Sequence, residues 1–192
     1  MMIESAALYR AAGISAVVAL VALVVSAIAI ALFFAGAGQV FGPINDVFVA
    51  VTLIALVLPI LAVDRVAGAQ AGLWLRIVTV AAITGAVLAA VGQLMLVAGV
   101  IDLQTSFVTG GLGIVPVLIW IVALVVLAVP VGVLPVWIGW LAAAAIALIV
   151  VGSVIAMATT GPVAWVTWAA VVVVLVAWLG SLAATFMSRT TA

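Results

Sequence analysis

The chain has 192 residues, of which 72% are hydrophobic and 4% are charged, and its formal net charge is zero. Ordinary soluble domains carry about 25% charged residues, so this composition excludes a water-soluble fold and predicts an integral membrane protein. Histidine, cysteine and lysine are absent, which argues against thiolate or imidazole metal sites, activated serine nucleophiles and lysine-based phosphate loops. A neutral chain without a basic run also argues against a nucleic-acid partner.

Six apolar stretches are each long enough to cross a bilayer as a helix, which takes about 20 residues. They are apolar all round and show no period of two, so helices are favoured over transmembrane strands. The predicted fold class is all-α: a polytopic six-helix bundle that forms a single domain over residues 1–192. The expected spans are residues 11–35, 46–63, 74–100, 112–129, 137–159 and 163–187.

The basic residues predict the orientation of this bundle. With six spans, Arg10, Arg65, Arg76 and Arg189 all fall at one end. Arginine and lysine next to short loops are retained on the cytoplasmic side. Both termini are therefore expected in the cytoplasm and the protein in the cell membrane. Aromatic residues are expected at the interfaces: Tyr9, Trp74, Trp137 and Trp140 at the inner one, Trp165 and Trp168 at the outer one, with Trp120 and Trp178 deeper.

Small residues recur at helical spacing and predict the faces along which the spans pack. Lipid tails are as apolar as leucine, so membrane helices associate through close contact of small side chains. Such stripes are Ser15, Ala19, Ala22 and Ser26 on the first span, Ala81, Gly85 and Ala89 on the third, Gly139, Ala143 and Ala147 on the fifth, and Gly180, Ala184 and Ser188 on the sixth.

The second span carries two features that point to local irregularity. Asn45 and Asp46 are expected to open the helix, where an acid caps free N–H groups and complements the helix dipole. Pro59 has no backbone donor, so it frees the carbonyl of Ala55 and favours a kink. In the connection that follows, Asp64 and the neighbouring arginines are expected to form surface ion pairs or to contact lipid phosphates.

Gln93, on the third span, is the most polar side chain within a predicted span. Its amide is costly to leave unpaired in hydrocarbon, and it continues the stripe of Gly85 and Ala89. Two interpretations remain open: a hydrogen bond to Thr52, Ser26 or a backbone carbonyl of another helix, or contact with a ligand. Thr52 is expected at a similar depth, in the outer half of the bundle. The candidate ligand-binding residues are Gln93 and Thr52, with Asp46 and Asp102 at the outer rim.

Two segments, residues 41–46 (FGPIND) and 134–141 (LPVWIGWL), resemble those of small six-pass membrane proteins of actinobacterial type. Both segments are interfacial turns that lead into a span. No activity is established for that family, so the resemblance implies a bacterial membrane protein with six spans and adds no mechanism.

We therefore expect a protein that is not an enzyme and needs no cofactor or metal. One function class is an accessory or scaffolding subunit of a membrane assembly, packed against itself as a homo-oligomer or against another membrane protein. The other is the binding or permeation of a neutral, largely apolar small molecule or lipid within the bundle, at an uncharged site near Gln93. Membrane lipids are expected partners in either case.

Overall fold

The computed structural model describes the backbone of residues 2–158 and 162–190, and the side chains of residues 6–155 and 165–190. Within these residues the helices make six spans long and apolar enough to cross a membrane, and one of the six, Phe41–Ala71, consists of two consecutive helices. The six-helix all-α bundle is thereby confirmed. The helices are α1 (Met2–Phe34), α2 (Phe41–Ala55), α3 (Val57–Ala71), α4 (Leu73–Val97), α5 (Leu103–Ala128), α6 (Val136–Ala158) and α7 (Pro162–Ser188).

Four helix boundaries differ from the prediction by five residues or more. The first helix begins at Met2 instead of residue 11. The second span begins at Phe41 instead of residue 46, and α3 continues to Ala71 through the segment expected as a connection. The fourth span begins at Leu103 instead of residue 112. Its first turns are polar but helical, and within them the Thr109 hydroxyl donates to the carbonyls of Thr105 and Ser106 in the preceding turn.

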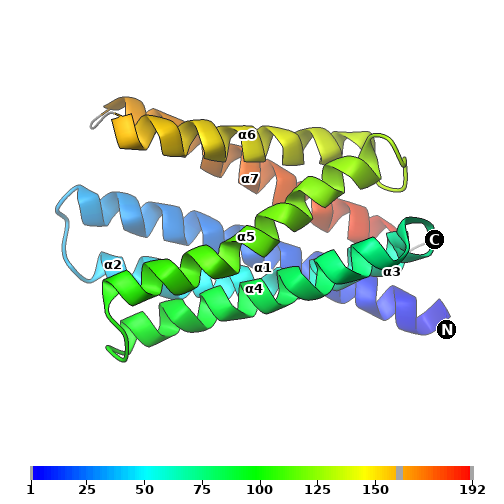
Figure 1. Cartoon of the computed structure of the whole chain (residues 1–192), viewed down its shortest axis with the longest axis horizontal. Coiled ribbons are helices and arrows are strands. Elements are labelled where there is room, and N and C mark those ends of the chain that lie inside the picture. The colour runs from blue at the N-terminus through cyan, green and yellow to red at the C-terminus, as the bar shows by residue number, and fades with distance from the viewer. Residues whose placement is uncertain (1, 159–161, 191–192) are drawn as a thin grey trace.

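The six spans form a closed ring. Each span packs against the next one along the chain, and α7 packs against α1. The start of α1 and the end of α7 lie at the same end of the bundle, together with the turn between α3 and α4 (Figure 1). The interior is filled by large side chains that are almost fully buried: Trp120, Leu124 and Leu127 of α5, and Trp178, Leu182 and Phe186 of α7.

The closest helix approach joins α4 to α5. A Cβ placed on Gly113 would lie 2.7 Å from both the Cβ and the backbone N of Ala89, and one on Gly92 would lie 2.6 Å from Thr109 Oγ1. The predicted stripe is confirmed at Gly85 and Ala89, which are buried, whereas Ala81 is exposed. Side chains are therefore nearly absent between these two backbones.

The other predicted stripes have mixed outcomes. On the first span Ala19, Ala22 and Ser26 are buried. On the fifth span Gly139 packs against α5, where a Cβ would lie 2.8 Å from the Cβ of Ala128, but Ala147 is exposed. On the sixth span Ala184 and Ser188 are exposed, so that stripe was wrong at two of its three positions.

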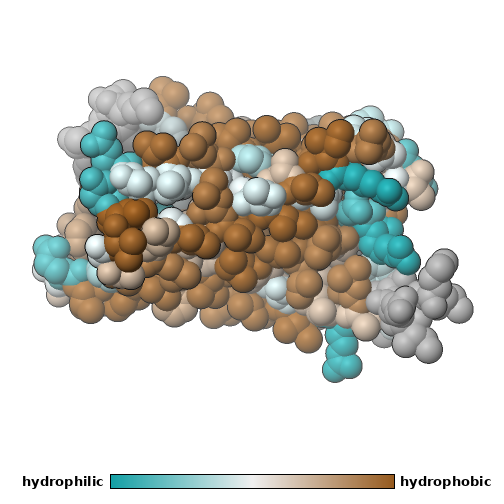
Figure 2. Space-filling model, turned by 60° about the horizontal axis from the view of Figure 1, so that its bottom comes forward, coloured by the Kyte–Doolittle hydropathy of each residue, from teal (hydrophilic) through white to brown (hydrophobic). Residues whose placement is uncertain are grey.

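The surface matches a bilayer in its layering. Figure 2 shows an apolar belt with hydrophilic residues gathered at the two ends of the molecule. Trp120 and Trp178 are buried and form an edge-to-face pair with ring centroids 6.0 Å apart. The tryptophans expected at the interfaces are all exposed: Trp74, Trp137, Trp140, Trp165 and Trp168.

Candidate functional site

The span made by α2 and α3 is interrupted in its middle. Pro59 cannot donate a backbone hydrogen bond, and Leu56 separates the two helices. The carbonyl of Ala55 is accordingly free of its helical partner and accepts a hydrogen bond from Ser15 Oγ of α1, at 2.7 Å. A polar backbone group at this depth needs such a partner because hydrocarbon supplies none. The predicted irregularity at Pro59 is confirmed, and its compensation comes from the neighbouring span.

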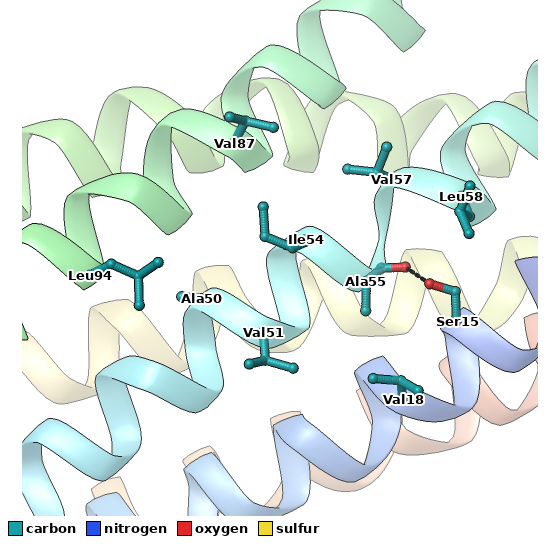
Figure 3. A pocket seen from close by; sticks show the side chains of 10 residues that line it. All are labelled: Ser15, Val18, Ala50, Val51, Ile54, Ala55, Val57, Leu58, Val87 and Leu94. Carbon is teal, nitrogen blue, oxygen red and sulfur yellow. Dashed lines mark hydrogen bonds between the residues drawn. The ribbon is translucent and has the colours of Figure 1, made fainter.

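An apolar groove lies at this interruption (Figure 3). Its volume is about 580 Å³, within the range of roughly 300–1,000 Å³ that ligand pockets have. Ala50 and Ala55 are buried, whereas Val18, Ile54 and Val87 are exposed. The groove therefore opens onto the lipid-facing surface. Four helices supply its lining: Ser15 and Val18 (α1), Ala50, Val51, Ile54 and Ala55 (α2), Val57 and Leu58 (α3), and Val87 and Leu94 (α4).

Gln93 and Thr52 do not pair with each other. The Thr52 hydroxyl donates to the carbonyl of Phe48 in its own helix, at 2.9 Å. Gln93 lies against α5, where its Nε2 is 3.7 Å from the position that a Cβ on Gly110 would take. Neither residue lines the groove. Ser15 is the residue whose side chain bonds to a backbone carbonyl of another span. The sequence contained two signals for this contact: Ser15 belongs to the stripe of small residues on α1, and Pro59 indicates that the Ala55 carbonyl is free.

Asp46 does not cap its helix, which corrects the expected role. The residue that precedes α2 is Val40, which makes no side-chain capping bond, and Asp46 lies one turn inside the helix. Its Oδ1 accepts a hydrogen bond from Asn45 Nδ2 at 3.0 Å, while Asn45 Oδ1 accepts one from Ser26 Oγ at 2.7 Å. This chain of three side chains joins α1 to α2 near the end opposite the arginines.

Asp102 takes the capping role instead. It precedes α5, and its Oδ1 accepts a hydrogen bond from the backbone N–H of Thr105 at 2.8 Å. The backbone hydrogen bond from Thr105 holds the pKa of Asp102 below its usual value of 3.8, because it favours the charged form. Asp102 is thus explained by helix structure.

At the arginine end, most charged side chains have no ionic partner among the described side chains. Arg10, Arg65 and Arg76 are exposed, and none of them forms a salt bridge within the described part of the chain. Asp64 Oδ1 is buried and has no hydrogen-bond partner among the described residues. Arg189 differs, because its Nη2 lies 3.5 Å from the carbonyl oxygen of Val133 and donates to it. The expected surface ion pair of Asp64 is therefore not formed among these residues, and contact with lipid phosphates is the interpretation that remains.

Residues that would hold a metal ion do not come together, since no group of three potential ligands is found among the described residues. The chain matches no family model, no curated protein and no solved structure. The resemblance of residues 41–46 and 134–141 to actinobacterial six-pass proteins consequently stays a prediction. Two features distinguish this surface: the apolar groove, and three exposed arginines that form no salt bridge within the described part of the chain.

Proposed function

We propose that this six-span membrane protein is a non-enzymatic accessory or scaffolding subunit of a membrane assembly. The observation that carries the proposal is the packed interior of the helix ring. Trp120 of α5 and Trp178 of α7 meet there and are 0% and 2% exposed. An interior filled by its largest side chains suits a structural element better than a route for a solute.

The distribution of polar groups supports the absence of catalysis. Asp102 is engaged as a helix cap and Asp46 accepts from Asn45. The hydroxyls of Ser15 and Thr52 donate to backbone carbonyls. A nucleophile needs an adjacent base within hydrogen-bond reach, and the chain has no histidine, lysine or cysteine to supply one. We expect these groups to stabilise the fold.

We further propose that the arginine end faces the cytoplasm, because basic residues beside short loops are retained there. Two exposed positions suit a labelling test, since the chain has no cysteine. Gln104 lies at the end opposite the arginines and Gln70 at the arginine end. In intact cells, a membrane-impermeant thiol reagent should label Gln104→Cys and spare Gln70→Cys. The reverse pattern would contradict the orientation.

The subunit role is tested by purification in a mild detergent followed by native mass spectrometry. The expected result is a stoichiometric complex, either with a second membrane protein or as a homo-oligomer of fixed size. A monomer without a protein partner, obtained in several detergents and in lipid nanodiscs, would overturn the proposal.

A second candidate function is favoured by a separate observation. The groove at the interruption of α2 and α3 has the volume of a ligand site and an apolar lining. It supports the binding of a lipid or another largely apolar molecule at the lipid-facing surface, at a different place from the interior site expected near Gln93. A molecule of lipid size retained by the purified protein would favour this function.

A further inference from the structure

The contents of the groove must come from the hydrocarbon region of the bilayer. Its walls are exposed on the apolar belt, with Ile54 48% and Val18 45% exposed. In Figure 3, Val18 lies on one side of α2, and Val87 with Leu94 lies on the other. The single polar contact in the groove, between Ser15 and the Ala55 carbonyl, is already satisfied within the protein. An occupant at this depth is therefore apolar.

The α4 residues that line the groove lie on the same helix face as Arg76. Val87 and Leu94 follow Arg76 by 11 and 18 residues, which at 3.6 residues per turn is about three and five whole turns. All three residues therefore lie on one face of α4. All three are also exposed. Along this face, Arg76 is about 16 Å from Val87 toward the arginine end of the bundle.

The wall formed by α3 leads to a second arginine. Arg65 follows Leu58 by seven residues, about two turns or roughly 10 Å, and therefore lies on nearly the same face. Leu61 stands between them and is exposed, as Arg65 is. Helices α3 and α4 pack against each other and are joined at Gly72, whose φ of 73° permits the tight turn. By helix geometry, Arg65 and Arg76 therefore lie on the groove sides of α3 and α4, toward the arginine end of the bundle.

We infer that the groove holds an acyl chain of one anionic phospholipid, whose phosphate is bound by Arg65 and Arg76. Neither arginine has a salt-bridge partner in the described part of the chain. Guanidinium groups bind phosphate oxygens through paired hydrogen bonds. Asp64 is next to Arg65 in the sequence. The formal charges of Arg65, Arg76 and Asp64 therefore add to +1, which the charge of one anionic lipid balances. This inference rests on the second candidate function, lipid binding in the groove, and specifies the class of lipid and the residues that bind its phosphate. It does not depend on the proposed subunit role.

The dimensions of the site fit one leaflet. From Arg65 to Ile54 is 11 residues, about 16 Å along the helices. The hydrocarbon core of a bilayer is about 30 Å thick, so one acyl chain reaches roughly 15 Å from its headgroup region. A lipid whose phosphate sits at the arginines therefore places the end of its chain beside Ile54, in the middle of the groove.

Native mass spectrometry tests the site, with the full chain equilibrated in vesicles that contain phosphatidylglycerol and phosphatidylcholine. The wild type should retain one phosphatidylglycerol in preference to phosphatidylcholine. The double variant Arg65→Gln/Arg76→Gln should lose about 25-fold of this preference, because each arginine near an anionic headgroup contributes roughly five-fold. Both side chains are exposed, and an unchanged circular dichroism spectrum will confirm that the variant is folded.

Arg10→Gln is the matched control. It removes one charge at the same end of the bundle, but Arg10 lies five residues from Ser15, about 140° away around α1. Its preference for phosphatidylglycerol should equal that of the wild type. If Arg10→Gln lowers the preference for phosphatidylglycerol as much as Arg65→Gln or Arg76→Gln does alone, the arginines attract anionic lipids in general. That result would overturn the site. An unchanged preference in the double variant would overturn it as well.

A second pair of variants tests the groove itself. Ile54→Trp fills the middle of the groove and should reduce retention of both lipids, whereas Val173→Trp adds the same side chain to an exposed position of α7 and should not. Equal retention in these two variants would overturn the acyl-chain assignment. A photo-crosslinker at Val87 should attach to lipid, and attachment to a helix of another protein would assign the groove to that partner instead.

Discussion

The α4–α5 pair and the group formed by α1, α2 and α3 hold helices together in two different ways. Between α4 and α5, Gly85 and Gly113 bring the backbones so close that a Cβ has no room. Between α1 and the interrupted span, hydroxyl groups make the contacts, as Ser15 bonds to the Ala55 carbonyl and Ser26 to Asn45. The α4–α5 contact depends on the absence of side chains, and the two backbones lie close together. The contact of α1 with the interrupted span depends on polar atoms, and a groove lies beside it.

Enlarging a glycine at the α4–α5 contact should have the largest effect. In Gly113→Ala the new Cβ would lie 2.7 Å from both the Cβ and the N of Ala89, so the helices must separate. Overpacking of this kind costs about 1–3 kcal/mol of unfolding free energy. Reversible unfolding in mixed micelles, followed by circular dichroism, measures this loss.

Gly111→Ala supplies the control on the same helix. No atom lies within 4 Å of the position of its Cβ, and alanine is favoured over glycine in a helix by about 1 kcal/mol. We expect this variant to be as stable as the wild type or more so. If both alanines lower the stability equally, close backbone approach does not explain the α4–α5 contact.

The hydrogen bond between Ser15 and the Ala55 carbonyl should contribute less to the unfolding free energy than the glycine contact does. Ser15→Ala leaves the Ala55 carbonyl without its hydrogen bond, and interhelical hydrogen bonds in membranes contribute about 1 kcal/mol. Pro59→Ala restores a backbone N–H that can donate to the same carbonyl. In the Pro59→Ala background, Ser15→Ala should therefore cost almost nothing. A double-mutant cycle measures this coupling, and additive losses would mean that the serine does not compensate for the proline.

Several of these features were predictable because they depend on local chemistry. Hydropathy and the one-sided arginines indicate six spans, and Pro59 indicates a freed carbonyl whatever the tertiary structure. The extra turns of α5 were missed because residues 104–111, which include Thr105, Ser106 and two glycines, have the composition of a loop. The signal that the helix starts at Leu103 was Asp102, three residues before Thr105, in the position of an N-cap.

Helix pairing was not predictable because it depends on residues far apart in the sequence. The stripe through Gly85 was identified, but its partner Gly113 lay where the span was expected only to begin. The groove likewise has its lining on four helices, and its apolar residues are indistinguishable in the sequence from other lipid-facing ones. The position of an arginine near the end of a span can be read from the sequence. That Arg65 and Arg76 lie on two helices that pack against each other requires the tertiary structure.

Gln93 is a polar residue on α4, the helix that packs against α5 through glycines. Within the described residues its amide makes no hydrogen bond, and it faces Gly110. Gln93→Leu should therefore change the unfolding free energy by less than about 0.5 kcal/mol. A loss of about 1 kcal/mol in the micelle unfolding assay would reveal an interhelical hydrogen bond of the kind seen at Ser15.

The smallest effect is expected at Asp102, outside the membrane-spanning segments. Its pKa is lowered by the backbone hydrogen bond from Thr105, so the charged cap stabilises the first turn of α5 above the unfolded pKa. That contribution is lost as the pH falls through the lowered pKa of the folded state, below 3.8. The amide resonance of Thr105 in micelles should shift over this acidic range. Asp102→Asn keeps an acceptor at the cap but cannot titrate, so its Thr105 resonance should stay constant, and a persistent shift would assign the titration to another group.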